Sequence, residues 1–171
     1  MAAACCFLCV DVDGDGLGLS LIGDDGAMLG HLDRNLAGKT GAVDDPMDWW
    51  RALRTGTKDL LRRCKAAPGA IRAVGLSGAL QRVVCVAADG TPTCPTAGLG
   101  PEALAAANQA IVERCGAGIL ANITGQIAAG TNMAAHLLWV QQHAKRAWHD
   151  LTHALYARDF LRLRLSGVAD R

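Results

Sequence analysis

The 171-residue sequence has almost no charge imbalance and few aromatic residues. Its 17 Lys and Arg residues nearly balance 16 Asp and Glu residues, which gives a formal net charge of +1. Since no basic stripe is interleaved with aromatic side chains, the sequence offers no electrostatic basis for binding nucleic acid. Hydrophobic residues make up 51% of the chain and charged residues 19%. This composition argues against disorder and is sufficient for the core of one ordinary domain.

The sequence also lacks a membrane span and a cysteine framework. The apolar start, MAAACCFLCV, has no cationic region and runs directly into acidic residues. It is therefore predicted to be the first strand of a cytoplasmic protein and not a signal peptide. No other apolar run approaches the length of a membrane span. The seven cysteines are odd in number and form no Cys/His cluster at zinc spacing. Cys6 and Cys9 have two residues between them, but their strand-like flanks favour core packing over a metal or redox role, so we expect reduced and mostly buried thiols.

The stretch from Cys9 to Asp33 is rich in glycine and acidic residues and dominates the interpretation. Glycine and aspartate favour the positive φ angles of tight hairpin turns, so the chain is predicted to open with a β-hairpin or meander. Its expected strands are residues 7–10, 17–22 and 27–32. Asp11, Asp13 and Asp15 alternate along this stretch. On an extended chain they share one face and can hold hydrated magnesium beside a nucleotide, or they form a solvated acidic turn.

The remaining elements follow from apolar periodicity. Asp44 or Asp45 is expected to cap a helix over residues 46–64 that has Pro46 at its first position. Helices are also predicted over residues 102–115 and 131–145, with a loop-like link between them. Residues 70–76 read as a buried strand and residues 83–87 as a further strand. The tail at residues 161–165 alternates as a strand would, although Asp159 can equally start a short helix. Strands mixed with long helices predict an α/β layer architecture.

In this order, several segments resemble the amino-terminal domain of the FGGY carbohydrate kinases, xylulokinase-like members in particular. The segments are Asp11 before the glycine hairpin, DDPMDWWRAL at 44–53, AVGLSGALQRVVCVAADGTP at 73–92, NITG at 122–125, HLLWVQQH and ARDFLRLRLSG. The resemblance implies an actin-like, ribonuclease-H-like ATPase domain, with a mixed sheet, an antiparallel opening hairpin and flanking helices. It also implies that the tail is a strand followed by a short helix. Residues 1–171 are then one domain, and the family's second, ATP-side domain is absent from this chain.

The resemblance implies a chemistry and a site as well. Family members transfer the γ-phosphoryl group of ATP to a sugar or polyol hydroxyl, with magnesium offsetting the phosphate charge. It assigns Asp11 to magnesium, through water, and Gly14 and Gly16 to the phosphate hairpin. Ser77 and Gly78 are assigned to the turn that borders the sugar. The family's catalytic aspartate is expected beyond Arg171, so no catalytic residue is assigned within the chain.

The chain departs from the family pattern at the positions that would contact ligands. Asp13 stands where the family has glycine, and Gly14 replaces a hydroxyl residue. Ala79, Leu80 and Gln81 replace the Gln-Met-His that approaches the sugar, and residues 99–102 replace a sugar-facing Trp-x-Asp-x-Arg. We therefore expect weak or absent ATP binding and impaired phosphorylation by this chain alone. The alternative is a non-catalytic binding or assembly module. Self-association, or a missing second domain, is expected in either case.

Overall fold

A computed structural model of the chain describes residues 5–13, 15–37, 45–78, 82–94, 100–125 and 133–168. The chain divides into two compact units, and the first is discontinuous in sequence. It comprises Met1–Ala79 and Ala157–Arg171, whereas the second comprises Leu80–Tyr156. That residues 1–171 act as one domain stays a prediction.

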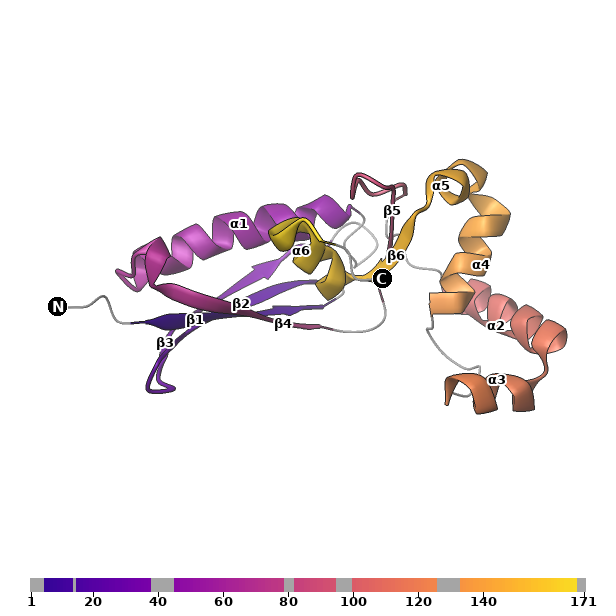
Figure 1. Ribbon diagram of the computed structural model, residues 1–171, viewed down its shortest axis with the longest axis horizontal. Helices are drawn as coiled ribbons and strands as arrows, with labels where there is room; N and C mark the ends of the chain where they lie inside the picture. Colours follow the sequence, from indigo (N-terminus) through magenta and orange to yellow (C-terminus); the bar gives the residue numbers. More distant parts are fainter. Residues whose placement is uncertain are drawn as a thin grey trace. The chain divides into compact units, whose positions relative to one another are not determined.

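The first unit is built on a four-stranded mixed sheet (Figure 1). Its strands lie in the order β3-β2-β1-β4, with β1 antiparallel to β2, β2 antiparallel to β3, and β1 parallel to β4. The strands are β1 (Cys6–Val12), β2 (Gly16–Gly23), β3 (Met28–Asn35) and β4 (Ile71–Gly78). The predicted opening hairpin, the third strand and the order β-β-β-α-β are confirmed, together with the mixed sheet of the predicted fold class.

One face of this sheet is covered by two helices, α1 (Pro46–Arg63) and α6 (Ala157–Ser166). Burial alternates strictly along β1, because successive side chains of a strand point to opposite faces. The covered face buries leucines and valines of β1, β2 and β3 against Trp49 of α1 and Phe160 of α6, both completely buried. The strand residues in this core are Leu8, Val10, Val12, Leu17, Leu19, Leu21 and Leu32.

Helix α1 begins where the sequence predicts. The Asp45 side chain accepts a hydrogen bond from the backbone N–H of Met47 at 2.9 Å, and Pro46 occupies the first turn. Asp48 lies in the positive first turn and Arg62 and Arg63 in the last turn, so charges at both ends complement the helix dipole. Of the two predicted caps, Asp45 is confirmed, whereas Asp44 lies outside the described residues. A short 3₁₀ turn, η1 (Pro68–Ala70), then leads into β4.

The prediction of a buried strand at residues 70–76 is wrong in one respect. These residues join the sheet as β4, but Arg72, Ala73, Val74 and Gly75 are exposed. The reason for this exposure is the position of the strand. Among the described strands, β4 pairs only with β1, so it lies at the edge of the sheet. A short apolar run is compatible with an edge strand as well as with a fully buried one.

In its described residues, the second unit pairs two short strands and carries four helices. Strands β5 and β6 are antiparallel and form a separate two-stranded sheet. The elements are β5 (Val83–Val86), α2 (Pro101–Cys115), α3 (Ala117–Thr124), α4 (Met133–His143), α5 (Lys145–Asp150) and β6 (His153–Tyr156). The tail is thus a strand followed by the helix α6. The alternative of a strand over residues 161–165 is wrong, since these residues pack Leu161 into the core as one helical face.

Two further predictions fail in this part of the chain. The link after residue 115 is not wholly a loop, because Gly116, with φ of 81°, redirects the chain and α3 follows directly. Its two isoleucines, Ile119 and Ile123, are 59% and 77% exposed. The apolar residues of this helix therefore form no buried stripe, and their spacing does not predict the helix. The cysteines are not mostly buried, since Cys6 and Cys85 are the only buried cysteines among the described residues.

Among the described helices, none has the length and apolar character to cross a membrane.

Candidate functional site

A row of four residues crosses the open face of the first unit's sheet, from β3 to β4. The strand register places Asp33 opposite Gly18, Gly18 opposite Asp11, and Asp11 opposite Ser77. Asp11 and Ser77 lie near the carboxyl ends of two adjacent parallel strands, and both are exposed. In open α/β sheets, ligands bind at the carboxyl ends of the strands. The structure therefore brings together two of the residues that the sequence assigned to different ligands.

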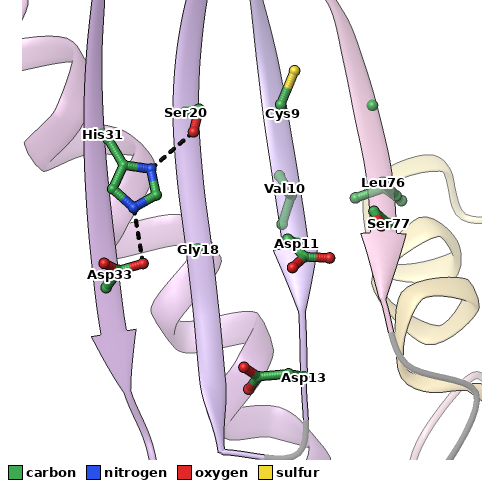
Figure 2. A pocket seen from close by; sticks show the side chains of 11 residues that line it. Cys9, Val10, Asp11, Asp13, Gly18, Ser20, His31, Asp33, Leu76 and Ser77 are labelled. Atoms are coloured by element: carbon green, nitrogen blue, oxygen red, sulfur yellow. Dashed lines mark hydrogen bonds and ion pairs between the residues drawn. The ribbon is translucent and has the colours of Figure 1, made fainter.

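A second row lies beside the first and contains a hydrogen-bonded chain of side chains. It runs His31, Ser20, Cys9 and Gly75 across the same four strands. The Nδ1 atom of His31 lies 2.9 Å from the Ser20 hydroxyl, and its Nε2 atom lies 3.0 Å from a carboxylate oxygen of Asp33 (Figure 2). These two contacts hold the His31 imidazole in a defined orientation on the open face of the sheet. Sequence reasoning missed the arrangement, because only the pairing of Ser20 with His31 across the hairpin reveals it.

The two rows form the floor of a depression of about 440 Å³ on the open face. It is lined by Cys9, Val10, Asp11, Asp13, Gly18, Ser20, His31, Asp33, Gly75, Leu76 and Ser77. Three of these are carboxylates and none is lysine or arginine. A phosphate-bearing ligand would therefore meet repulsion at this surface unless a cation accompanied it. In Figure 2, Asp11 projects from β1 and Asp33 from β3, whereas Asp13 lies in the turn that follows β1.

Asp13 turns back on the hairpin that follows β1. Its carboxylate oxygen accepts hydrogen bonds from the backbone N–H groups of Asp15, at 2.9 Å, and Gly16, at 2.6 Å. This is an Asx-type turn, in which the side chain of an aspartate satisfies the amides just after it. The two N–H groups are thus already bonded to an internal anion, the Asp13 carboxylate. Of the alternatives for the alternating aspartates, Asp13 and Asp15 form the solvated acidic turn.

The predicted glycine sites have tight backbone surroundings. A Cβ atom at Gly16 would lie 2.1 Å from the carbonyl oxygen of Arg34 on β3, so this glycine permits close pairing of the strands. A Cβ atom at Gly78 would lie 2.5 Å from the carbonyl oxygen of Val12 on β1. Both glycines are thus required by strand packing, whatever ligand they border. Gly14 lies outside the described residues, as do residues 79–81 and 95–99, which include Leu99 of the substituted sugar-facing segment.

The donor set around Asp11 limits the metals that can bind. Within the described ranges, no three His, Cys, Asp or Glu side chains are grouped closely enough to hold a metal ion. Magnesium keeps several waters and binds through one or two carboxylates plus phosphate oxygens. The exposed carboxylate of Asp11 beside the depression fits that mode.

Sequence comparison places the chain in a family. The family model for the FGGY family of carbohydrate kinases, N-terminal domain, matches residues 19–170. The chain belongs to the FGGY family. The predicted resemblance is therefore confirmed. No curated protein sequence matches the chain.

Solved structures of FGGY relatives share the fold. A gluconate kinase from Lactobacillus acidophilus matches with a TM-score of 0.81 at 16% identity, over 97% of this chain and 34% of that one. A xyloylose kinase from Brucella ovis matches at 0.75 and 22% identity, over 92% and 34%. A xylulose kinase from Rhodospirillum rubrum matches at 0.77 and 17% identity, over 96% and 35%. The chain thus spans about a third of the length of each, and the actin-like fold class is confirmed.

Proposed function

We propose that this chain supplies the sugar-side part of the site of an ATP-dependent carbohydrate kinase. The observation that carries the proposal is the depression at the carboxyl ends of β1 and β4, where Asp11 lies opposite Ser77. Family membership supports the reaction class, which is transfer of a phosphoryl group to a sugar or polyol hydroxyl. The structural relatives named for xylulose and gluconate support a small polyhydroxylated substrate. Ser77 and Gly78 border the sugar in this proposal.

Magnesium enters the proposal because the depression is acidic. Asp11, Asp13 and Asp33 all line it, so a polyphosphate would approach three carboxylates. A divalent cation held by Asp11 through water would offset this repulsion and neutralise charge as the phosphoryl group moves. ATP is then bound as its magnesium complex, with Gly14 and Gly16 in the hairpin beside the phosphates. We place the protein in the cytoplasm, where ATP is plentiful.

Asp13 is the reason to propose weak nucleotide binding by this chain. Its carboxylate accepts the two hairpin N–H groups that an incoming phosphate would otherwise use. Phosphate must displace this internal anion and also tolerate its charge nearby. Binding by these 171 residues alone is therefore proposed to be weak or absent. Turnover is proposed to be negligible, because the chain spans about a third of the kinases that it matches.

Titration calorimetry with ATP and magnesium tests the role of Asp13. Asp13→Gly should bind magnesium-ATP more tightly than the unmodified chain, because it frees two N–H groups and removes one negative charge. Asp11→Ala should abolish the dependence of that binding on magnesium. Asp24→Ala is the matched control, since it removes a carboxylate from the β2–β3 turn and should change nothing. Equal affinity of the Asp13→Gly variant and the parent would refute the internal-anion argument.

A coupled assay over ketoses and polyols tests the predicted inactivity. We expect no turnover above background from the 171-residue chain. Loss of a positioned general base alone typically removes about 10²- to 10⁴-fold in rate. Loss of the closing domain removes orientation and water exclusion as well. Robust phosphorylation of any tested sugar by this chain would contradict the proposal of inactivity while leaving the family assignment intact.

A non-catalytic binding or assembly module is the second candidate function. It is favoured by a third row on the open face, where Met28, Ile22, Phe7 and Ala73 lie opposite one another. Met28 is 65% exposed and Phe7 is 40% exposed. Such an apolar surface promotes self-association. Light scattering at high protein concentration should then report species larger than a monomer, and Phe7→Ser should reduce them. A strictly monomeric parent chain would count against this function.

A further inference from the structure

Two cysteines of the second unit pack in one cluster, and neither is among the residues that line the depression. Cys85 lies in β5 and is 2% exposed, whereas Cys94 is half-buried and packs against the same apolar cluster. Nine positions separate them, and neither forms a disulfide. The pair was not apparent from the sequence, because the spacing matches no redox or metal motif.

The backbone between the two cysteines folds back on itself. Beyond β5 the chain turns at Asp89 and Gly90, and Pro92 forms an antiparallel bridge with Val86. Thr93 then donates from its backbone N–H to the carbonyl oxygen of Cys85 at 2.9 Å, and its hydroxyl donates to the same oxygen at 3.3 Å. The chain bends at Thr93 and Cys94. The Cys94 side chain is thereby held beside that of Cys85.

The two cysteines pack in one apolar cluster and differ in environment. Interaction with the neighbouring Cys85 thiol, and to a lesser extent with Thr93, lowers the pKa of Cys94 to about 7, although burial acts in the opposite direction. Interaction with Cys94, together with burial, raises the pKa of Cys85. Thiolates are the nucleophilic form of cysteine. Cys94, which is also the more accessible of the two, is therefore the reactive member of the pair.

We propose that Cys85 and Cys94 form a reversible disulfide when the protein meets a peroxide or a small-molecule disulfide. This inference does not depend on the proposed kinase function. The two cysteines start from one packed cluster, with Thr93 bonded to the backbone of Cys85, and their sulfur atoms must close to a bond of about 2.05 Å. In cytosolic proteins such bonds are typically transient, redox-responsive ones.

The chemistry balances with either oxidant. With hydrogen peroxide, the Cys94 thiolate takes one oxygen to give a sulfenic acid, and water is released once the leaving hydroxide takes up a proton. The Cys85 thiol then attacks the sulfenic sulfur, which forms the S–S bond and releases a second water. With glutathione disulfide, Cys94 first forms a mixed disulfide and one glutathione leaves. Cys85 then displaces the second glutathione, so two protein thiols are oxidised and one disulfide is reduced.

Closure would lock the turn that follows β5. The bond encloses the segment from Cys85 to Cys94, so it removes conformational freedom from that segment in the unfolded chain. Its sulfur atoms lie against Val83, Val140 and Ala147, the buried residues of the second unit's cluster. We therefore expect the oxidised form to resist denaturant better than the reduced form, and a dithiol reductant to reverse the difference.

Peptide mapping of the intact 171-residue chain tests the proposal directly. Trypsin leaves both cysteines on one peptide, residues 83–114, because no lysine or arginine lies between Arg82 and Arg114. After oxidation and alkylation of free thiols, this peptide should carry no alkyl group and weigh about 2 Da less than its reduced, unalkylated form. Reduction before alkylation should restore two alkyl groups. Cys115, on the next peptide and exposed, should remain alkylated and serves as the internal control.

The variants separate this bond from other oxidation products. Cys94→Ser should leave Cys85 alkylated after the same treatment, and Cys115→Ser should leave the bond unaffected. Wild-type mapping decides the matter even if the Cys94 variant does not fold. A peptide that keeps two alkyl groups after full oxidant exposure would overturn the proposal. Stable glutathione adducts, higher oxides of Cys94, or links to a second chain in place of the internal bond would also overturn it.

Discussion

The two faces of the first unit's sheet carry very different side chains on the same strands. The covered face is formed by leucines and valines, several of them completely buried under α1 and α6. The open face carries Asp11, Ser20, His31, Asp33 and Ser77 around the depression. Because side chains alternate along a strand, neighbouring residues serve the two faces independently. Residues that stabilise the fold thus alternate along each strand with residues that can contact a ligand. Substitutions on the covered face should therefore lower stability, whereas substitutions on the open face should leave it nearly unchanged.

The largest expected effect is on the covered face, at Leu19. This side chain is completely buried in the middle of β2. Leu19→Ala should lower the free energy of unfolding by about 2–5 kcal/mol, because it removes apolar burial and leaves a cavity. Denaturant unfolding followed by circular dichroism measures the loss. A loss below about 1 kcal/mol would mean that α1 collapses onto the gap, and that the face is packed less tightly than described.

A smaller effect is expected at Gly56, where α1 packs against Leu19 of β2. A Cβ atom there would lie 2.3 Å from the Cδ1 atom of Leu19. Gly56→Ala should therefore cost about 1–3 kcal/mol through overpacking, although alanine is the better helix former. In the Leu19→Ala background the same change should cost much less, since the clashing methyl group is gone. Additive losses in this double-mutant cycle would rule out the contact as the cause.

A third prediction concerns an ion pair between β3 and α1 on the covered side of the sheet. The guanidinium of Arg34 on β3 donates to the carboxylate of Asp59 on α1, and both side chains are about one-third exposed. Asp59→Asn should cost about 0.2–1 kcal/mol, in the range of partly exposed pairs. The loss should shrink in high salt, which screens such pairs. Asp24→Asn is the control, and a loss that salt leaves unchanged would indicate packing as its origin.

The smallest effect is expected on the open face. Ser20→Ala removes the hydroxyl that contacts His31, one position from Leu19 but on the opposite face. Its free energy of unfolding should change by no more than about 0.5 kcal/mol, as at other surface positions. Denaturation beside Leu19→Ala gives the direct comparison. A loss of several kcal/mol would show that the hydrogen-bonded chain supports the sheet, and the contrast between the faces would fail.

Much of the first unit can be predicted from its sequence because the local signals agree. Alternation of apolar residues marks β1 and β2, and Asp45 with Pro46 marks the start of α1. The alignment of Asp11 with Ser77 is not available locally, since it depends on the parallel register of two strands and the residues are 66 positions apart in the sequence. Family resemblance supplied both residues, but it gave them separate roles. Their adjacency emerged only from the sheet.

The remaining features depend on geometry that no pattern encodes. The contact between Ser20 and His31 requires the register of β2 and β3, which shifts at a bulge between Leu21 and Ile22. Asp13 was predicted to repel phosphate by its charge, whereas its carboxylate also takes the hairpin amides. In α3 the residues with the strongest apolar character are exposed, so burial periodicity gives no signal there.

The discontinuity of the first unit has a consequence for its synthesis. Helix α6 buries Phe160 and Leu161 on a sheet whose strands end at Gly78, yet the 77 residues Leu80–Tyr156 of the other unit come between them. At about 5–20 residues per second, a ribosome needs roughly 4–15 s to cross that stretch. During this interval the sheet has α1 but not its second cover. A nascent chain therefore presents apolar surface for seconds, the time in which chaperones act on emerging polypeptides.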